Sequence, residues 1–401
     1  MEGSPSRKPL KAGILTLHYG YNEGAVLQAY CLVQLLKTTA GMEAEIVDLR
    51  YPAKAAVYGP PSDPRKEAIA HSAIHWLPCS KQHWNSIPGP DFYQELERNY
   101  DVLVVGSDVV WTLRYTRTFR KLIPGGVFAR QKEPFFPKFP NAYWLPHPLE
   151  IPKFSYAASI GSFDWQLAPK RHQRKMKSLL QAFTGISVRD QKTIGLLNHL
   201  DPQLANQATL VPDPTLCVPL NQINPNAKEV ESKLKSWGLA EDKRKLGLMM
   251  GNKEKYLPLI KALKGQEWEL VSLTTQNEFS DHSFYQRPLT PRDWARAIGY
   301  FDFIVTERMH GMIFCLKNKV PFLALEINPH SKESPSKVVS LLETFDLMDC
   351  YCPTTATPEQ LLTTLKTAMN RDWDWTKIDA VIEALKQDGE RFIHTIPKAC
   401  H

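Results

Sequence analysis

The sequence has no hydrophobic run long enough to cross a lipid bilayer. A spanning helix takes about 20 consecutive apolar residues, and no stretch of this chain approaches that length. Near the N-terminus, the apolar segment Ala12–Leu17 ends at His18 and is too short for the core of a signal peptide. We therefore expect a cytoplasmic protein without a transmembrane segment.

The sequence also lacks the cysteine pattern of a disulfide framework or a zinc site. Its 7 cysteines are an odd number, and Cys31 and Cys315 lie within apolar segments, where a small buried thiol packs well. A reducing compartment is therefore expected. His71 and His75 have helical spacing, but no carboxylate or third ligand is spaced to join them, so no metal is expected.

Charge of one sign is only mildly in excess. The formal net charge is +7, which is compatible with an anionic substrate such as a phosphate or carboxylate, although a solvated basic surface explains most of it. No tract of Lys and Arg with interleaved aromatic residues appears, so a nucleic-acid partner is not expected. The basic segment Lys170–Lys177 is best interpreted as the solvated face of a helix.

What the 401 residues do contain is a regular alternation of strand-like and helix-like segments, on a chain long enough for two domains. Buried strands are predicted at 11–17, 44–49, 101–108, 153–161, 185–190, 209–214, 245–250, 268–273, 301–306 and 320–325. Helical segments between them predict parallel sheets with crossover connections.

The pattern predicts an α/β fold of two doubly wound Rossmann-like domains that face each other across a cleft. A boundary rich in proline and asparagine near 215–228 separates the domains. The first domain is predicted at 1–215, with a loop-rich excursion at 52–150. The second is predicted at 216–401 and ends in C-terminal helices.

Ligands of such folds bind at the carboxyl ends of the strands, and three polar segments are predicted there in the first domain. The turn that contains Asn22 and Gly24 opens a helix whose free N–H groups suit an anion, although the intervening glutamate opposes a phosphate. Ser107 and Asp108 end a buried strand, where the carboxylate could order a sugar hydroxyl or cap a helix. Arg189 suits bidentate binding of a carboxylate or phosphate, or it could pair with the adjacent aspartate.

The strongest candidate follows strand 301–306 in the second domain. There Glu307, Arg308, His310 and Gly311 form the turn between a strand and a helix. Arg308 and His310 are two residues apart, so both can face one cleft. Arg308 can hold an anion, His310 can exchange a proton near neutral pH, and Gly311 lets the chain turn closely.

The motifs together resemble those of a known family. In chain order they are NEGAVLQAY (22–30), GSDVVW (106–111), SYAASIG (155–161), ISVRD (186–190), DPTL (213–216), ERMHG (307–311) and SPSKVVSLLETFDL (334–347). Their order resembles the polysaccharide pyruvyl transferases over residues 11 to 350. Three positions depart from the family pattern: Glu23 replaces a tyrosine, Val109 a glutamine and Glu307 an aspartate.

The resemblance implies a fold like that of GT-B glycosyltransferases, phosphoenolpyruvate as the donor, and no cofactor or metal. The acceptor would be a sugar diol of a glycan or glycolipid, which receives the pyruvyl unit as a ketal while phosphate is released. It also implies that the first domain takes the acceptor and the second the donor.

The resemblance further implies that Arg189 and Arg308 bind the donor's carboxylate and phosphate and that His310 is the acid or base. The other substrate-binding candidates are Asn22, Gly24, Ser107, Asp108, Glu307 and Gly311. Two alternatives stay open. One is a sugar-nucleotide glycosyltransferase of the same fold, and the other is a non-catalytic member that binds an anionic glycan or peptide.

Overall fold

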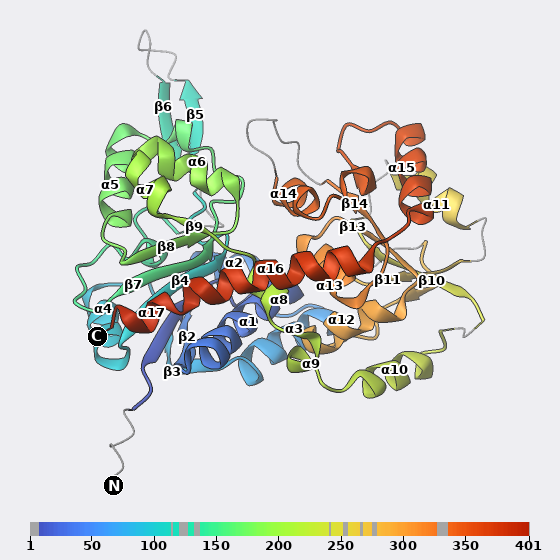
Figure 1. Ribbon diagram of the computed structural model, residues 1–401, viewed down its shortest axis with the longest axis horizontal. Coiled ribbons are helices and arrows are strands. Elements are labelled where there is room, and N and C mark those ends of the chain that lie inside the picture. The colour runs from blue at the N-terminus through green and yellow to red at the C-terminus, as the bar shows by residue number, and fades with distance from the viewer. Residues whose placement is uncertain are drawn as a thin grey trace.

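The computed structural model describes residues 8–113, 115–119, 127–131, 137–239, 242–251, 256–264, 268–274, 279–326 and 336–400. Figure 1 shows two lobes side by side, each built around a sheet, with a long helix near the C-terminus that runs across both. In the part of the chain that is described, no helix combines the length and the apolar character that a membrane crossing requires.

The first lobe contains a seven-stranded parallel sheet in the order β3-β2-β1-β4-β7-β8-β9. Its strands are β1 (Lys11–Leu15), β2 (Glu43–Leu49), β3 (Cys79–Trp84), β4 (Val102–Asp108), β7 (Lys153–Ala158), β8 (Gly185–Val188) and β9 (Thr209–Leu210). The central strands β4 and β7 are buried along their whole length, as expected where helices cover both faces of a parallel sheet.

Helices cover both faces of this sheet. Its helices are α1 (Glu23–Ala40), α2 (Pro52–Tyr58), α3 (Pro64–His75), α4 (Pro90–Asn99), α5 (Lys170–Leu180), α6 (Gln191–Leu200) and α7 (Pro202–Gln207). Side chains of α1 and α3 share one apolar cluster with the sheet, and side chains of α4, α5 and α6 share the other. The excursion predicted at 52–150 also includes the antiparallel hairpin of β5 (Tyr115–Phe119) and β6 (Val127–Gln131); residues 114, 120–126 and 132–136 of it lie outside the described residues.

The second lobe contains a six-stranded parallel sheet in the order β12-β11-β10-β13-β14-β15. Its strands are β10 (Arg244–Met249), β11 (Trp268–Ser272), β12 (His282–Ser283), β13 (Phe303–Thr306), β14 (Phe322–Leu325) and β15 (Tyr351–Cys352). Its helices include α10 (Ala227–Ser236), α11 (Leu257–Lys264), α12 (Pro291–Ala297), α13 (Met309–Asn318), α14 (Lys337–Thr344) and α15 (Pro358–Asn370). Counted in order of appearance, the strands of both sheets begin 3-2-1-4-5-6, which is the Rossmann order.

The predicted fold class is therefore confirmed. Two differences from the expected strands have simple physical causes. β3 was not predicted, because this edge strand is half-exposed to exposed along its length and carries no apolar run. The strands expected at 153–161 and 185–190 end earlier, at Ala158 and Val188, because the chain turns out of the sheet there, and Asp190 already caps α6.

The two lobes are tied together by the C-terminal helices. α16 (Trp375–Ile393) begins in the second lobe, where Ile378 joins its core. Its last turn reaches the first sheet, where the Phe392 ring lies 6.2 Å from Phe154 and 6.3 Å from Tyr156, centroid to centroid. The last helix, α17 (Thr395–Lys398), also packs on the first lobe, so one helix holds both lobes in place.

Candidate functional site

The candidate site lies where the strand order of each sheet reverses. In the first sheet this point is between β1 and β4, and in the second it is between β10 and β13. The loops that follow such neighbouring strands leave in opposite directions, which opens a crevice. Asn22 follows β1, Asp108 ends β4 and Arg308 follows β13. The predicted segments therefore meet at the fold's own binding edge.

The first turn of α1 faces the catalytic candidates of the second lobe. Asn22 caps this helix, and its side chain accepts a hydrogen bond from the Gly24 N–H at 3.0 Å. A Cβ atom on Gly24 would lie 2.2 Å from Nδ1 of His310, which is closer than any side chain tolerates. The predicted glycine is therefore required by the approach of the His310 imidazole.

Arg189 and His310 come together on one carboxylate. Arg189 donates from Nη1 to Oδ2 of Asp213 at 2.8 Å and from Nη2 to Oδ1 of Asp108 at 3.1 Å, and only 3% of its side chain is exposed. Nε2 of His310 lies 3.5 Å from the same Oδ2 of Asp213. That distance is an electrostatic contact rather than a short hydrogen bond.

Asp213 begins α8 (Pro214–Cys217), in the segment between the two sheets. Its Oδ1 accepts hydrogen bonds from the backbone N–H of Thr215 at 3.1 Å and from the Thr215 hydroxyl at 2.7 Å. Burial alone would raise the pKa of Asp213, but the positive charges of His310 and Arg189 outweigh it and lower the pKa. Asp213 is therefore a charged and fixed group that faces His310.

Asp108 is held in an uncommon backbone conformation. Its φ is 75°, in the left-handed region that a non-glycine residue adopts only when the surrounding structure imposes it. Burial would raise the pKa of its carboxyl, whereas Arg189 and Lys337 lower it, and the net direction is downward. The strained strand end thus aims a carboxylate at Arg189.

A second ion-pair cluster joins the two lobes beside His310. Arg65 of α3 donates from Nε and Nη2 to the two carboxylate oxygens of Glu23 at 2.7 and 2.6 Å, and both side chains are buried. Nη1 of Arg308 lies 3.8 Å from Oε2 of Glu23. The charge of Glu23, which by sequence opposes an anion in this turn, is therefore neutralised by Arg65.

Arg308 keeps part of its side chain exposed. Burial lowers its pKa, and the negative charge of Glu23 opposes that effect. Even so, 32% of the Arg308 side chain is exposed. Since Arg189 is almost wholly buried between two carboxylates, Arg308 is the more accessible of the two predicted anion-binding arginines.

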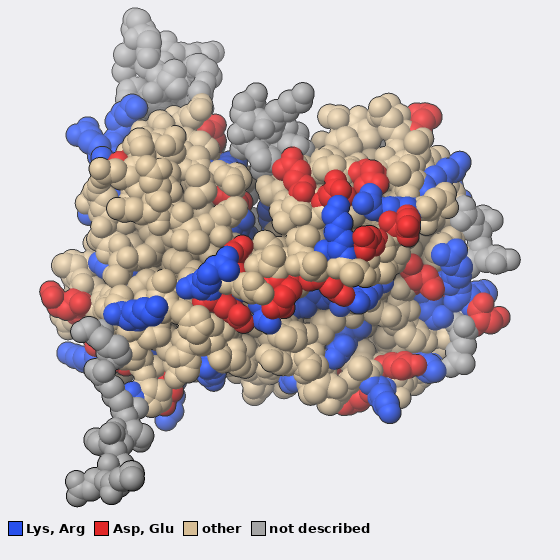
Figure 2. Space-filling model, in the orientation of Figure 1, with Lys and Arg blue, Asp and Glu red and all other residues tan. Residues whose placement is uncertain are grey.

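A cavity of about 260 Å³ lies between the lobes next to this cluster. Its walls include Arg189 and Asp213 from the first lobe and linker, Met309 and Lys337 from the second lobe, and Leu385 of α16. Lys337 begins α14, and although the residue as a whole is exposed, burial of its amine and the positive charge of Arg189 lower the pKa of that amine. Figure 2 shows a furrow between the two lobes above α16.

Two polar atoms of this cluster are buried without a hydrogen-bond partner: Nε of Arg189 and Nε2 of His310. Buried polar atoms normally find partners, and those that do not call for an explanation. A polar ligand in the crevice would supply one. Within the described ranges, no group of three or more His, Cys, Asp or Glu side chains is arranged to hold a metal ion.

Three of the predicted substrate-binding residues lie beneath or behind the crevice. Ser107 is fully buried and hydrogen-bonds to Gln28 of α1. The Glu307 carboxylate accepts from the Gly251 N–H at 3.0 Å and from the Tyr256 hydroxyl at 2.7 Å. At Gly311 a Cβ would lie 2.6 Å from Oγ1 of Thr306. These contacts fix the loops, and direct substrate contact by these residues stays a prediction.

Sequence reasoning missed three residues of the site: Arg65, Asp213 and Lys337. Arg65 pairs with a residue 42 positions away, and no local pattern indicates such a contact. Asp213 and Lys337 do lie within motifs noted in the sequence, at 213–216 and 334–347. Asp213 precedes Pro214 and a short helix, a pattern that is typical of a helix cap rather than of a site residue. Residues 334–335, at the start of the second motif, lie outside the described residues.

Comparisons with known proteins bear on the family and the fold. A model of the family described as polysaccharide pyruvyl transferase matches residues 22–329. No curated protein sequence matches the chain.

Solved structures share the architecture at low sequence identity. UDP-GlcNAc 2-epimerase from Neisseria meningitidis, bound to UDP-GlcNAc, has a TM-score of 0.57 at 8% identity and covers 98% of this chain and 100% of its own. The epimerase from Methanocaldococcus jannaschii has a TM-score of 0.55 at 12% identity, with 97% and 100% covered. A glycosyltransferase from Rickettsia africae has a TM-score of 0.54 at 11% identity, with 98% and 99% covered. At these identities the likeness establishes the fold alone.

Proposed function

The chain belongs to the polysaccharide pyruvyl transferase family, and we propose that it moves the pyruvyl unit of phosphoenolpyruvate onto a sugar diol. The product is a cyclic ketal on a glycan or glycolipid, and inorganic phosphate is released. The proposal is supported above all by one observation: His310 and Arg308 of the second lobe meet Asp213 and Glu23 at the crevice between the lobes.

Phosphoenolpyruvate carries about three negative charges near neutral pH, so its site needs cations. Arg308 suits this task because 32% of its side chain is exposed. Lys337 is a second cation, and it lines the cavity between the lobes. Arg189 directs two of its donors at Asp108 and Asp213, and only its Nε is without a partner. Donor binding through that atom stays a prediction.

The chemistry requires two hydroxyl protons to leave the acceptor. One proton ends on C3 of the enol, which becomes a methyl group, and this makes C2 electrophilic. The first hydroxyl oxygen forms a bond to C2 and the second closes the ring as the C–O bond to phosphate breaks. The second proton leaves with the phosphate.

We assign His310 to proton transfer in this sequence, because it is the neutral-range acid or base at the site. Asp213 would stabilise positive charge on the imidazole, and the cations would stabilise the departing phosphate. N-terminal lobe residues would then hold the acceptor.

The test is phosphate release from phosphoenolpyruvate with a library of galactosyl, mannosyl and N-acetylmannosaminyl acceptors. His310→Ala should abolish phosphate release while phosphoenolpyruvate still raises the melting temperature. Arg308→Met should remove that thermal shift. His75→Ala, on the exposed end of α3, and Arg98→Met, with 71% of its side chain exposed, are the matched controls.

Full turnover by His310→Ala would remove His310 from the mechanism. Stabilisation by nucleotide sugars, with none by phosphoenolpyruvate, would instead indicate a sugar-nucleotide glycosyltransferase. Binding of phosphoenolpyruvate without phosphate release for any acceptor would indicate a non-catalytic member.

A further inference from the structure

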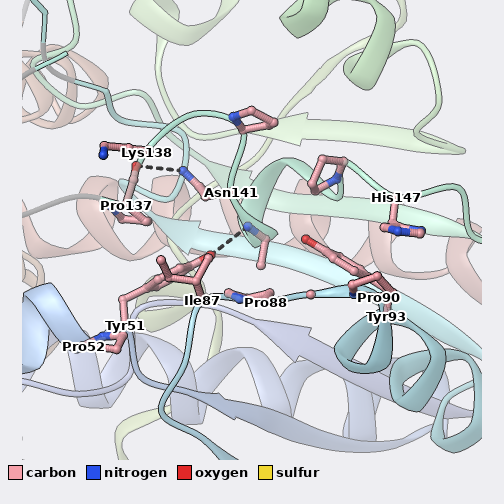
Figure 3. Close-up of a pocket in the computed structure, with 14 residues that line it drawn as sticks. Tyr51, Pro52, Ile87, Pro88, Pro90, Tyr93, Pro137, Lys138, Asn141 and His147 are labelled. Carbon is pink, nitrogen blue, oxygen red and sulfur yellow. Dashed lines mark hydrogen bonds between the residues drawn. The ribbon is translucent and has the colours of Figure 1, made fainter.

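The first lobe contains a second and larger cavity, of about 560 Å³, which the site described above does not use. Its volume is within the range of pockets for small organic ligands. Figure 3 shows its residues in a ring, with Tyr93 and His147 at one end and Pro137 and Lys138 at the other. The walls come from the loop after β2, the loop that leads into α4 with the first turn of that helix, and the segment 137–147.

The lining is apolar and rigid. Six of the chain's 31 prolines line this cavity, and a pyrrolidine ring offers hydrocarbon surface with a fixed backbone. Ile87 also lines it, and this side chain is 81% exposed, which is high for a residue of its kind. The imidazole of His147 stacks on Tyr93, with ring centroids 5.0 Å apart.

Two polar groups of the wall, the Tyr51 hydroxyl and the Asn141 amide, already have hydrogen-bond partners beside the cavity. The Tyr51 hydroxyl accepts a hydrogen bond from the Ala142 N–H at 2.8 Å. The Asn141 side chain donates to the Pro137 carbonyl at 3.3 Å and accepts from the Tyr143 N–H at 3.1 Å. Tyr93, His147 and Lys138 also line the cavity, but most of its wall is proline and other hydrocarbon surface. Such a wall favours a hydrocarbon group over a sugar ring, whose hydroxyls would each need a partner.

The cavity lies at the same sheet edge as the candidate site. Tyr51 follows β2 directly, and its N–H donates to the Tyr19 hydroxyl at 3.0 Å. The Tyr19 ring packs edge-on against Tyr58 at 6.4 Å. Tyr58 in turn covers Gly20, where a Cβ would lie 2.6 Å from its ring, in the loop that leads to Asn22. A wall of tyrosines therefore joins the cavity to the first turn of α1.

From this geometry we propose that the cavity binds a hydrocarbon chain attached to the acceptor sugar. The acceptor would be a glycolipid or alkyl glycoside whose sugar lies at the crevice and whose apolar end lies against the proline wall. This inference rests on the proposed function for the identity of the acceptor. It gives the proline-rich segments around 52, 87–90 and 137–147 a role in acceptor choice.

A binding experiment tests the cavity without any turnover. Nile red fluorescence reports occupancy by an apolar probe, and octyl and methyl glucoside compete for it at concentrations below micelle formation. Octyl glucoside should displace the dye at least about tenfold more effectively, because burial of two methylene groups already gives such a gain. Equal displacement by the two glucosides would overturn the proposal.

Two substitutions locate the effect. A Cβ on Gly89 meets no atom within 4 Å, and its φ of −110° suits any residue, so Gly89→Phe can fill the cavity without strain. Ile87→Asp places a charge against the apolar wall. Ile74→Asp is the matched control, since Ile74 is 57% exposed on α3. Both cavity variants should lose the tenfold octyl preference, and the control should keep it.

A second measurement separates this inference from the proposed function. With a competent sugar, the KM for its octyl glycoside should lie about tenfold below that for its methyl glycoside, and Gly89→Phe should remove the difference. If phosphate is released and Gly89→Phe keeps the octyl preference, the cavity proposal fails while the transferase stands. If octyl chains bind at this cavity but no acceptor releases phosphate, the apolar cavity stands while the transferase fails.

Discussion

Nε2 of His310 lies 3.5 Å from Oδ2 of Asp213, an oxygen that also accepts a hydrogen bond from Arg189. The two residues belong to different parts of the chain, Asp213 to the segment between the sheets and His310 to the turn after β13. The hydrogen bond from Arg189 fixes the carboxylate, so the imidazole faces a negative charge of defined position. The relationship makes Asp213 a positioning residue for His310.

Replacing Asp213 tests this relationship. Asp213→Asn keeps the size of the side chain but removes its charge, and we expect kcat for phosphate release to fall roughly 100-fold, within the range typical of acid–base catalysis. The KM for phosphoenolpyruvate should change less than about threefold, since Asp213 repels rather than binds the donor. The pH profile of kcat should also shift. Asp164→Asn, an exposed cap in the same lobe, is the control, and an unchanged pH profile in Asp213→Asn would refute the assignment.

The buried pair of Glu23 and Arg65 predicts strong coupling in stability. Arg65→Met leaves a buried carboxylate without its partner and should lower the free energy of unfolding by about 3–5 kcal/mol. Glu23→Gln with Arg65→Met removes both charges and should recover most of that loss. Urea denaturation of the two single variants and the double variant measures the coupling. Additive effects would show that the pair does not act as a unit.

The close approach of Gly24 to His310 predicts a selective loss of activity. Gly24→Ala should displace the imidazole, because the added Cβ would lie 2.2 Å from Nδ1, and kcat should fall at least about tenfold. Gly195→Ala is the control: in helix α6 its added Cβ would come no closer than 3.4 Å to the ring of Trp165. Activity equal to wild type in Gly24→Ala would mean that the lobes separate more during turnover than they do here.

Asp48 predicts how stability changes in acid. Its carboxylate contacts Nε2 of His18 at 2.9 Å, Nδ1 of His83 at 2.7 Å and Nε of Arg50 at 2.9 Å. Burial raises the pKa of Asp48. The hydrogen bond and charge of His18 and the charge of Arg50 lower this pKa by more than burial raises it, so the folded-state pKa lies below the ordinary value.

A depressed carboxyl pKa stabilises the fold above pH ~4, and the contribution is lost as pH falls through the folded-state pKa. Between pH 5 and pH 3 the free energy of unfolding of the wild type, measured by urea denaturation, should therefore fall by about 1 kcal/mol more than that of Asp48→Asn. The exposed Asp372→Asn should behave like the wild type. Parallel curves for wild type and Asp48→Asn would contradict the prediction.

Much of the fold follows from local patterns. Short apolar runs such as 101–108 are typical of buried strands in a sheet that helices cover on both faces, and β4 is buried throughout. The helix after Asn22 can also be predicted from the sequence, because Asn22 caps its start and Gly41, with φ of 62°, ends it. Edge strand β3 could not be predicted from the sequence, because an exposed edge strand needs no apolar face.

The sequence by itself determined the alternation of strands and helices, the crossover connections of parallel sheets and the spacing that sets Arg308 two residues before His310. The reason is that these features depend on the period of apolar residues and on neighbours along the chain. Only the tertiary structure decided that Arg65 neutralises Glu23, that Asp213 faces His310, and that prolines near 52, 88 and 140 enclose one cavity. Those contacts join residues far apart in sequence, and their energies come from burial and charge in the folded interior rather than from any local preference.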